Sequence, residues 1–135
     1  GAITSDIFNP ATVGVGIKTV TYTVVDVATS CSFDTSYITQ VYTTPNASIS
    51  GLAATYCDHQ PDTLTGSPLG GTFVGSGMTG NIFDPAAAGV GSHTIQYIIN
   101  NGVGCSDTAS QTTIVSPILQ PVISGLAGGY CTSTP

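Results

Sequence analysis

The chain of 135 residues has seven acidic residues and a single basic one, Lys18, which gives a formal net charge of −6. A surface with one cation does not neutralise phosphates, so this composition excludes nucleic-acid binding and docking on anionic lipid. Charged residues make up 6% of the chain and hydrophobic residues 41%, which indicates a folded protein. No apolar stretch reaches membrane-spanning length, so we expect no membrane insertion.

Strands and turns account for most of the sequence pattern, because Gly, Pro, Thr, Val, Ile and Tyr are abundant and favour these structures over helix. Polar and apolar residues alternate most clearly over 18–24 and 93–99. In chain order, the expected strands are 18–24, 47–51, 62–66, 71–75, 80–84, 93–99 and 106–115. The expected turns, where Gly and Asn supply positive φ, are 67–71, 88–91 and 100–102. This spacing predicts an all-β fold of Greek-key β-sandwich modules, immunoglobulin-like in the broad sense.

The alternation also predicts which side chains form the core, because side chains on a strand point to opposite faces in turn. We expect Thr94 and Gln96 to face solvent. The residues expected inside are Phe83, Ile95, Tyr97 and Ile99.

An internal repeat is the strongest signal in the chain, because residues 1–57 are written a second time at 76–131. The motif Phe-Asn-Pro-Ala at 8–11 returns as Phe-Asp-Pro-Ala 75 positions later. The offset falls to 74 by Cys57, which returns as Cys131. One residue is therefore missing between Tyr97 and Cys105, and a loop is expected there. A period of this length fits a tandem array of small all-β modules.

The repeat divides the chain into three predicted parts. These are the C-terminal half of one β-sandwich repeat (1–44), a complete repeat (45–117) and the start of the next repeat (118–135). The half-repeat would expose apolar faces and unpaired edges if nothing covered it. We therefore expect Ile3, Phe8 and Val20 to be covered by neighbouring repeats of a longer parent chain. The alternative is strand addition between copies in a fibre.

Several motifs occur in a fixed order: Ile-Ser-Gly-Leu-Ala-Ala-Thr-Tyr-Cys at 49–57, Gly-Gly-Thr-Phe at 70–73, Phe-Asp-Pro-Ala at 83–86 and Gly-Cys-Ser-Asp-Thr at 104–108. This order resembles the PKD-like and Ig-like tandem repeats of giant Bacteroidetes cell-surface adhesins, including gliding-motility adhesins secreted by the type IX system. The resemblance implies an extracellular location on a bacterial cell surface. It brings no catalytic residues with it, so an enzyme is not expected.

We therefore expect a structural or adhesive segment that acts as an extended stalk or as a multivalent fibre, where many weak sites give avidity. The expected partners are neighbouring repeats or other copies, and surface polysaccharide is a further candidate. The alternative function is a non-catalytic accessory module, carbohydrate-binding or spacer, of a secreted polysaccharide-degrading enzyme. The absence of Trp argues against an aromatic carbohydrate platform.

Each repeat carries two cysteines, and paired cysteines in a secreted β-module indicate a disulfide more often than a metal site or a nucleophile. We expect a Cys57–Cys105 disulfide in the complete repeat, with Cys31 and Cys131 left without partners. The competing scheme joins Cys31 to Cys57 and Cys105 to Cys131, which requires the chain to double back across a strand and a linker. The first scheme has its own difficulty, because the two cysteines are expected at opposite poles of a sandwich. Both schemes stay open.

Modification and calcium binding are two further predictions. Thr63 and Thr108 lie in Asp-Thr-apolar tripeptides, a pattern that Bacteroidetes O-glycosylate, so a glycoprotein with both hydroxyls facing solvent is expected. Calcium would take its oxygen ligands from Asp58, Asp62, Asp84 and Asp107. These acids lack the spacing of an EF-hand loop, and no other cofactor is expected. Neither His59 nor His93 has zinc-ligand spacing from a cysteine pair, so both are expected to be solvated surface residues.

Overall fold

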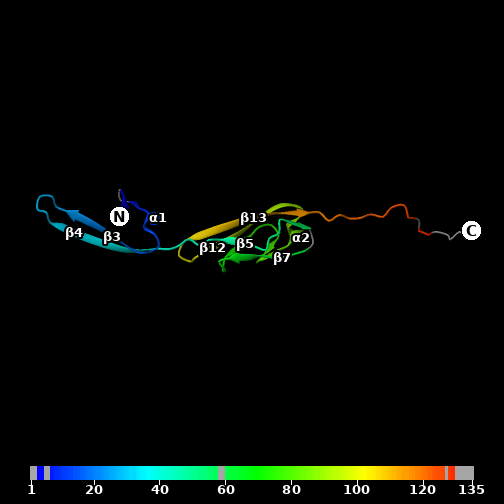
Figure 1. Ribbon diagram of the computed structural model, residues 1–135, viewed down its shortest axis with the longest axis horizontal. Helices are drawn as coiled ribbons and strands as arrows, with labels where there is room; N and C mark the ends of the chain where they lie inside the picture. Colours follow the sequence, from blue (N-terminus) through cyan, green and yellow to red (C-terminus); the bar gives the residue numbers. More distant parts are fainter. Residues whose placement is uncertain (1–2, 5–6, 58–59, 127, 130–135) are drawn as a thin grey trace, which may run out of the picture.

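The computed structural model is an all-β protein with two short helices, and it describes residues 3–4, 7–57, 60–126 and 128–129 (Figure 1). The chain has three parts: the first segment (3–4 and 7–44), the middle module (45–117) and the tail (118–126). The first segment contains β1 (Ile3–Thr4), β2 (Ile7–Phe8), α1 (Pro10–Val13), β3 (Gly16–Val25) and β4 (Ser32–Val41). The middle module contains β5 (Ser48–Ser50), β6 (Thr55–Cys57), β7 (Asp62–Thr63), β8 (Thr65–Ser67), β9 (Thr72–Val74), β10 (Met78–Thr79), β11 (Ile82–Phe83), α2 (Pro85–Ala88), β12 (Gly91–Asn100) and β13 (Ser106–Ser116).

The structure repeats as the sequence does. Strands β1, β2 and β3 and helix α1 return as β10, β11, β12 and α2 with an offset of 75 residues, and β4 returns as β13 with an offset of 74. The pairing register is also copied, because Gly16 lies opposite Val41 in the first hairpin and Gly91 lies opposite Val115 in the second. The offset changes in the hairpin loop, at 26–31 in one copy and 101–105 in the other, which confirms the predicted site of the missing residue.

The short helix in each copy is positioned by its first and last residues. The Asn9 side chain accepts a hydrogen bond from the Ala11 N–H, and the Asp84 side chain does the same for the Ala86 N–H. Asn and Asp are equivalent in this role, because each offers an oxygen to an N–H group that the helix leaves free. Both helices end at a glycine of positive φ, so the Asn/Asp–Pro–Gly pattern sets the entry into the long hairpin.

The middle module is a β-sandwich with two principal sheets. One sheet has the strand order β6-β13-β12-β9 and the other β10-β11-β7, while β5 pairs with β8. Strand β6 runs parallel to β13, and the remaining pairs in the described residues are antiparallel. Leu64 separates β7 from β8, so one stretch of chain pairs first with β11 and then with β5.

The core lies between these sheets of the middle module. The predicted inside residues are buried, with 0% exposure at Phe83 and Ile95, 2% at Tyr97 and 6% at Ile99. Thr94 and Gln96 are exposed, which confirms the predicted register of β12. The buried residues form two clusters, one of Leu64, Phe83, Ile95 and Val115 and the other of Ile49, Tyr97 and Ile99.

Three local features differ from the sequence expectations. The single strand expected at 80–84 is the end of a small hairpin, in which β10 and β11 turn at Gly80 with φ of 60°. Strand β6 was not expected, because three residues are too few for an alternation pattern. Residues of the Phe-Asp-Pro-Ala motif form a helical turn rather than a plain glycine turn, because Asp84 caps it.

Figure 1 shows the β3–β4 hairpin on one side of the middle module and the tail on the other. The tail forms no strand over residues 118–126, and its residues are exposed. Phe8 and Val20 are half-buried, and the side chain of Ile3 lies outside the described residues. In the part of the chain that the structure describes, no helix has the length and apolar character needed to cross a membrane.

Candidate functional site

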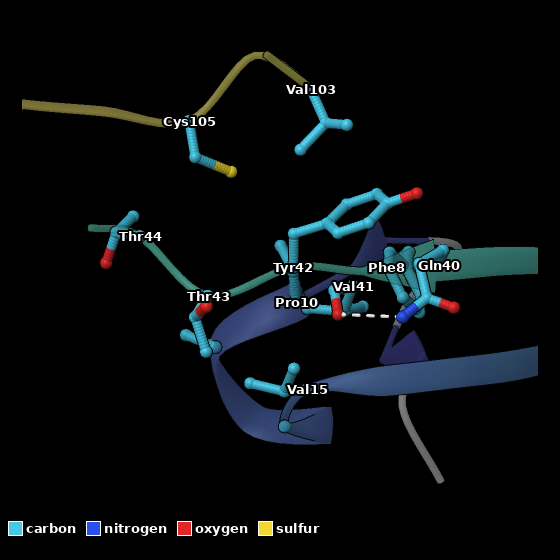
Figure 2. Close-up of a pocket in the computed structure, with 12 residues that line it drawn as sticks. Phe8, Pro10, Val15, Gln40, Val41, Tyr42, Thr43, Thr44, Val103 and Cys105 are labelled. Atoms are coloured by element: carbon cyan, nitrogen blue, oxygen red, sulfur yellow. Dashed lines mark hydrogen bonds between the residues drawn. The ribbon is translucent and has the colours of Figure 1, made fainter. Parts of the chain in front are cut away.

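The seam between the first segment and the middle module is the candidate site. A hollow of about 750 Å³ lies there, and none of its lining residues is charged. Figure 2 shows the Tyr42 ring between the 101–105 loop and the first segment, with Val103 and Cys105 on the loop side. The lining residues are Phe8, Pro10, Ala11, Gly14, Val15, Gln40, Val41, Tyr42, Thr43, Thr44, Val103 and Cys105.

We define the linker as residues 42–47, between β4 and β5, and two hydrogen bonds tie it to the β12–β13 hairpin and its loop. The Asn101 Nδ2 atom donates to the Thr43 carbonyl oxygen at 3.1 Å. The Ala47 N–H donates to Asp107 Oδ2 at 2.7 Å, a bond strengthened by the carboxylate charge. The Asn101 Oδ1 atom also accepts from the N–H groups of Val103 and Cys105, each at 3.1 Å, so the loop itself is held in shape. The linker therefore has a defined direction where it enters the middle module.

The expected Cys57–Cys105 disulfide is wrong for this structure. Both thiols are free, and Cys57 lies opposite Ser116 at one end of β13 while Cys105 precedes the other end. At about 3.3 Å per strand residue the two are about 35 Å apart, far beyond the Cα limit of about 7 Å for a disulfide. Cys31 is also free. This excludes the competing Cys31–Cys57 bond in this structure, and Cys131 lies outside the described residues.

Thr63 and Thr108, the predicted O-glycosylation sites, are exposed on β7 and β13. Their accessibility meets the condition for modification, which itself stays a prediction. The acids that precede them have structural partners. The Tyr56 hydroxyl donates to Asp62 Oδ2 at 2.8 Å, and Asp107 accepts from the linker as described above.

The acids proposed as calcium ligands do not converge. Asp62 and Asp107 are held by different elements, and Asp84 caps α2. Asp58 lies outside the described residues, as does His59. The described residues contain no group of three or more His, Cys, Asp or Glu side chains arranged for a metal ion. His93 is half-buried rather than solvated, because its Nε2 atom donates to the Gly89 carbonyl at 2.7 Å and supports the turn before β12.

Among the residues that the structure describes, two titratable groups have clearly shifted pKa values. Burial raises the pKa of Tyr56, and the neighbouring Asp62 carboxylate raises it further. The Ala28 N–H group, donating to Asp26 at 2.8 Å in the exposed hairpin loop, lowers the pKa of that carboxyl. Each shift follows from a local fold contact, and neither group lies in the seam.

Comparison with known family models, curated proteins and solved structures gave no match.

Sequence reasoning predicted that the first segment would expose apolar faces if nothing covered it, but it did not place the aromatic residues of β4 on such a face with those of β3. Val20 lies opposite Tyr37 and Val24 lies opposite Phe33, so these side chains share one face of the hairpin with Tyr22. Phe33 is 75% exposed, Tyr37 74% and Tyr22 64%. The signal was present in the alternation of β3, but 32–41 was not recognised as a strand, so its aromatics were not placed on the same face.

Proposed function

We propose that this chain is a structural segment of an extended tandem array, serving as the stalk or adhesive fibre of a secreted bacterial surface protein. The observation that carries the proposal is the seam. Two copies of the same set of elements follow one another, and the linker between them is bonded to the second copy through Asn101 and Asp107. A stalk needs such fixed junctions, because a freely jointed chain would not hold a tip away from a surface.

The middle module is well arranged for mechanical load along the chain. Its early strand β6 lies parallel to its last strand β13, with Thr55 opposite Ile114 and Cys57 opposite Ser116. Tension on the linker before the module reaches β6 through β5 and residues 51–54, whereas tension on the linker after it acts directly on β13. Once β5 has yielded, the neighbouring strands β6 and β13 are pulled in opposite directions along their length. The hydrogen bonds between them then share the load in shear rather than opening one after another. The buried Thr113 hydroxyl adds a bond to the Ala53 carbonyl at 2.8 Å beside this pair.

The stalk proposal is tested by the distance between spin labels on Cys31 and Cys57, both of which are exposed. The other two cysteines are replaced by serine. One narrow distance distribution is expected, and it should broaden when Asn101→Ala and Asp107→Ala are combined. Asp34→Ala is the matched control, since it removes an acid without touching the seam. A broad distribution in the parent protein would contradict a rigid seam.

The alternative function, a carbohydrate-binding accessory module, is favoured by the exposed aromatic face on β3–β4. The equivalent of Tyr22 in the middle module is Tyr97, which is 2% exposed in the core. This comparison favours an uncovered core face over a carbohydrate platform. Retention of the protein on insoluble polysaccharide, lost on Tyr22→Ala, would support the accessory function instead.

A further inference from the structure

The exposed face of β3–β4 has the composition of a sandwich interior. We define the open face as Val20, Tyr22, Val24, Phe33 and Tyr37, which lie on one side of the hairpin. Tyr22 is 64% exposed and Val24 is 50% exposed. Their counterparts on β12, at an offset of 75 residues, are Tyr97 at 2% and Ile99 at 6%. The same hairpin is therefore covered in one copy and uncovered in the other.

The cover on the middle module identifies what fits this face. Ile49 on β5 is 8% exposed and forms one buried cluster with Tyr97 and Ile99. Leu52, which is half-buried, packs against that cluster. The interface between this stretch of chain and the β12–β13 hairpin is thus already present once in the molecule.

The tail carries a second copy of the sequence that covers the hairpin in the middle module, and the apolar residues of this second copy are exposed. Ile123 and Leu126 stand 74 positions after Ile49 and Leu52, in the same Ile-Ser-Gly-Leu sequence. Ile123 is 81% exposed and Leu126 is 71% exposed, in a stretch that forms no strand. One molecule therefore displays both halves of the interface, the open face in its first segment and the covering sequence in its tail.

A difference between the copies also matches the open face to the tail. In the middle module the Ala47 N–H donates to the Asp107 carboxylate. At an offset of 74 residues the counterpart of Ala47 is Pro121, which has no N–H, and the counterpart of Asp107 is Phe33, which has no carboxylate. A tail seated on the open face therefore leaves neither a donor nor an acceptor unpaired at this position, and places a proline ring near a phenyl ring.

We propose that the open face of one copy of the chain is covered by the tail of a second copy, so that molecules associate head to tail. The contact joins two different surfaces, so it does not close on itself in a pair and extends into a filament or a ring. This inference deepens the proposed stalk function, on which it rests, by naming the partner as a second copy of this chain. Association covers side chains of the open face, of which Tyr22, Val24, Phe33 and Tyr37 are exposed and Val20 is half-buried, and so removes hydrophobic surface from water.

The test uses the full chain with two variants, Tyr22→Asp on the open face and Ile123→Asp on the tail. Molar mass is measured by sedimentation over a range of protein concentrations. The parent chain should grow in mass with concentration, whereas each variant alone should remain a monomer. Mixed in equal amounts, the variants should form a dimer of twice the monomer mass and nothing larger. Each mixed pair has only one intact open face and one intact tail that can meet.

Two control variants distinguish this specific contact from non-specific hydrophobic association. Ile38→Asp changes a residue of similar exposure, 67%, on the opposite face of β4, and Ser124→Asp places the same charge beside Ile123. Both should associate as the parent does. Circular dichroism and the thermal midpoint of the middle module should stay unchanged in every variant, since all four positions lie outside it.

A parent chain that is monomeric at all concentrations would overturn the proposal. So would a mixture of the two variants that stays monomeric, or an Ile38→Asp variant that fails to associate. The spin-label distance measured in the monomeric Tyr22→Asp variant reports on the seam independently. Failure of the association and failure of the stalk proposal are therefore distinguishable.

Discussion

Gly66→Ala is expected to destabilise the middle module by crowding one buried ring. A Cβ atom built on Gly66 would lie 2.2 Å from Tyr97 Cε2 and 2.3 Å from Tyr97 Cζ, far inside contact distance. Gly66 has no left-handed backbone conformation, so the cost comes from this contact and not from φ. The Tyr97 ring is held in place by two hydrogen bonds, because its hydroxyl donates to the Pro68 carbonyl at 2.5 Å and accepts from the Gly71 N–H at 2.8 Å.

The magnitude follows from those contacts. Overpacking a close-packed site costs about 1–3 kcal/mol, and each hydrogen bond lost when the ring shifts adds about 0.5–1.5 kcal/mol. We therefore expect the free energy of unfolding to fall by about 2–4 kcal/mol, a large part of the stability of a small module. This decrease in the free energy of unfolding is measured by urea unfolding, followed by circular dichroism at two protein concentrations.

The control for chain entropy is Gly128→Ala, where an added Cβ meets nothing within 4 Å. A double-mutant cycle then identifies the cause, because in a Tyr97→Ala background the ring is absent and the cost of Gly66→Ala should fall below about 0.5 kcal/mol. If the cost is small in the parent protein, or persists without the ring, the packing argument is refuted.

Three further predictions concern other contacts. Thr113→Val should lower the unfolding free energy by about 0.5–1.5 kcal/mol in urea titrations, because it removes the hydrogen bond from the buried Thr113 hydroxyl to the Ala53 carbonyl. Thr112→Val, at an exposed position, is the control. The pKa of Tyr56 is raised in the fold, so the stability that its neutral hydroxyl contributes should be fully present below about pH 10 and be lost as the pH rises through the folded pKa. Unfolding midpoints measured against pH should show this decrease, and Tyr56→Phe should reduce it. Protein from its native cell should carry O-linked sugar at Thr63 and Thr108, seen as an excess in intact mass that Thr63→Ala and Thr108→Ala remove; an unmodified mass would contradict the tripeptide assignment.

The repeat and the core were predictable because each has a direct sequence signal. Period-2 alternation placed Ile95 and Tyr97 inside the sandwich and Thr94 outside, since the pleat allows no other arrangement. The change of offset from 75 to 74 located the loop after β12, since a residue is lost most easily between strands.

The disulfide and the open face were not predictable in the same way. The spacing of cysteines along the chain does not reveal the end of the sandwich at which each one lies. Because β6 pairs with the last residues of β13, Cys57 lies at the end of the sandwich opposite Cys105. The open face required strand 32–41 to be recognised, but its alternation is interrupted by polar residues at inward positions such as Thr35 and Thr39. The role of Asp107 was also missed, because its partner is a backbone N–H 60 residues away.

The central claim is that the first segment is the second half of the same module that residues 45–117 build in full. It is tested most directly by the calorimetric unfolding enthalpy of a chain in which a copy of residues 45–75 is placed before Gly1. The added strands should cover Tyr22 and Val24 as β5–β9 cover their counterparts. At about 0.7 kcal/mol per residue, a second folded module of about 75 residues should raise the enthalpy by about 50 kcal/mol. An enthalpy equal to that of the parent chain would contradict the claim.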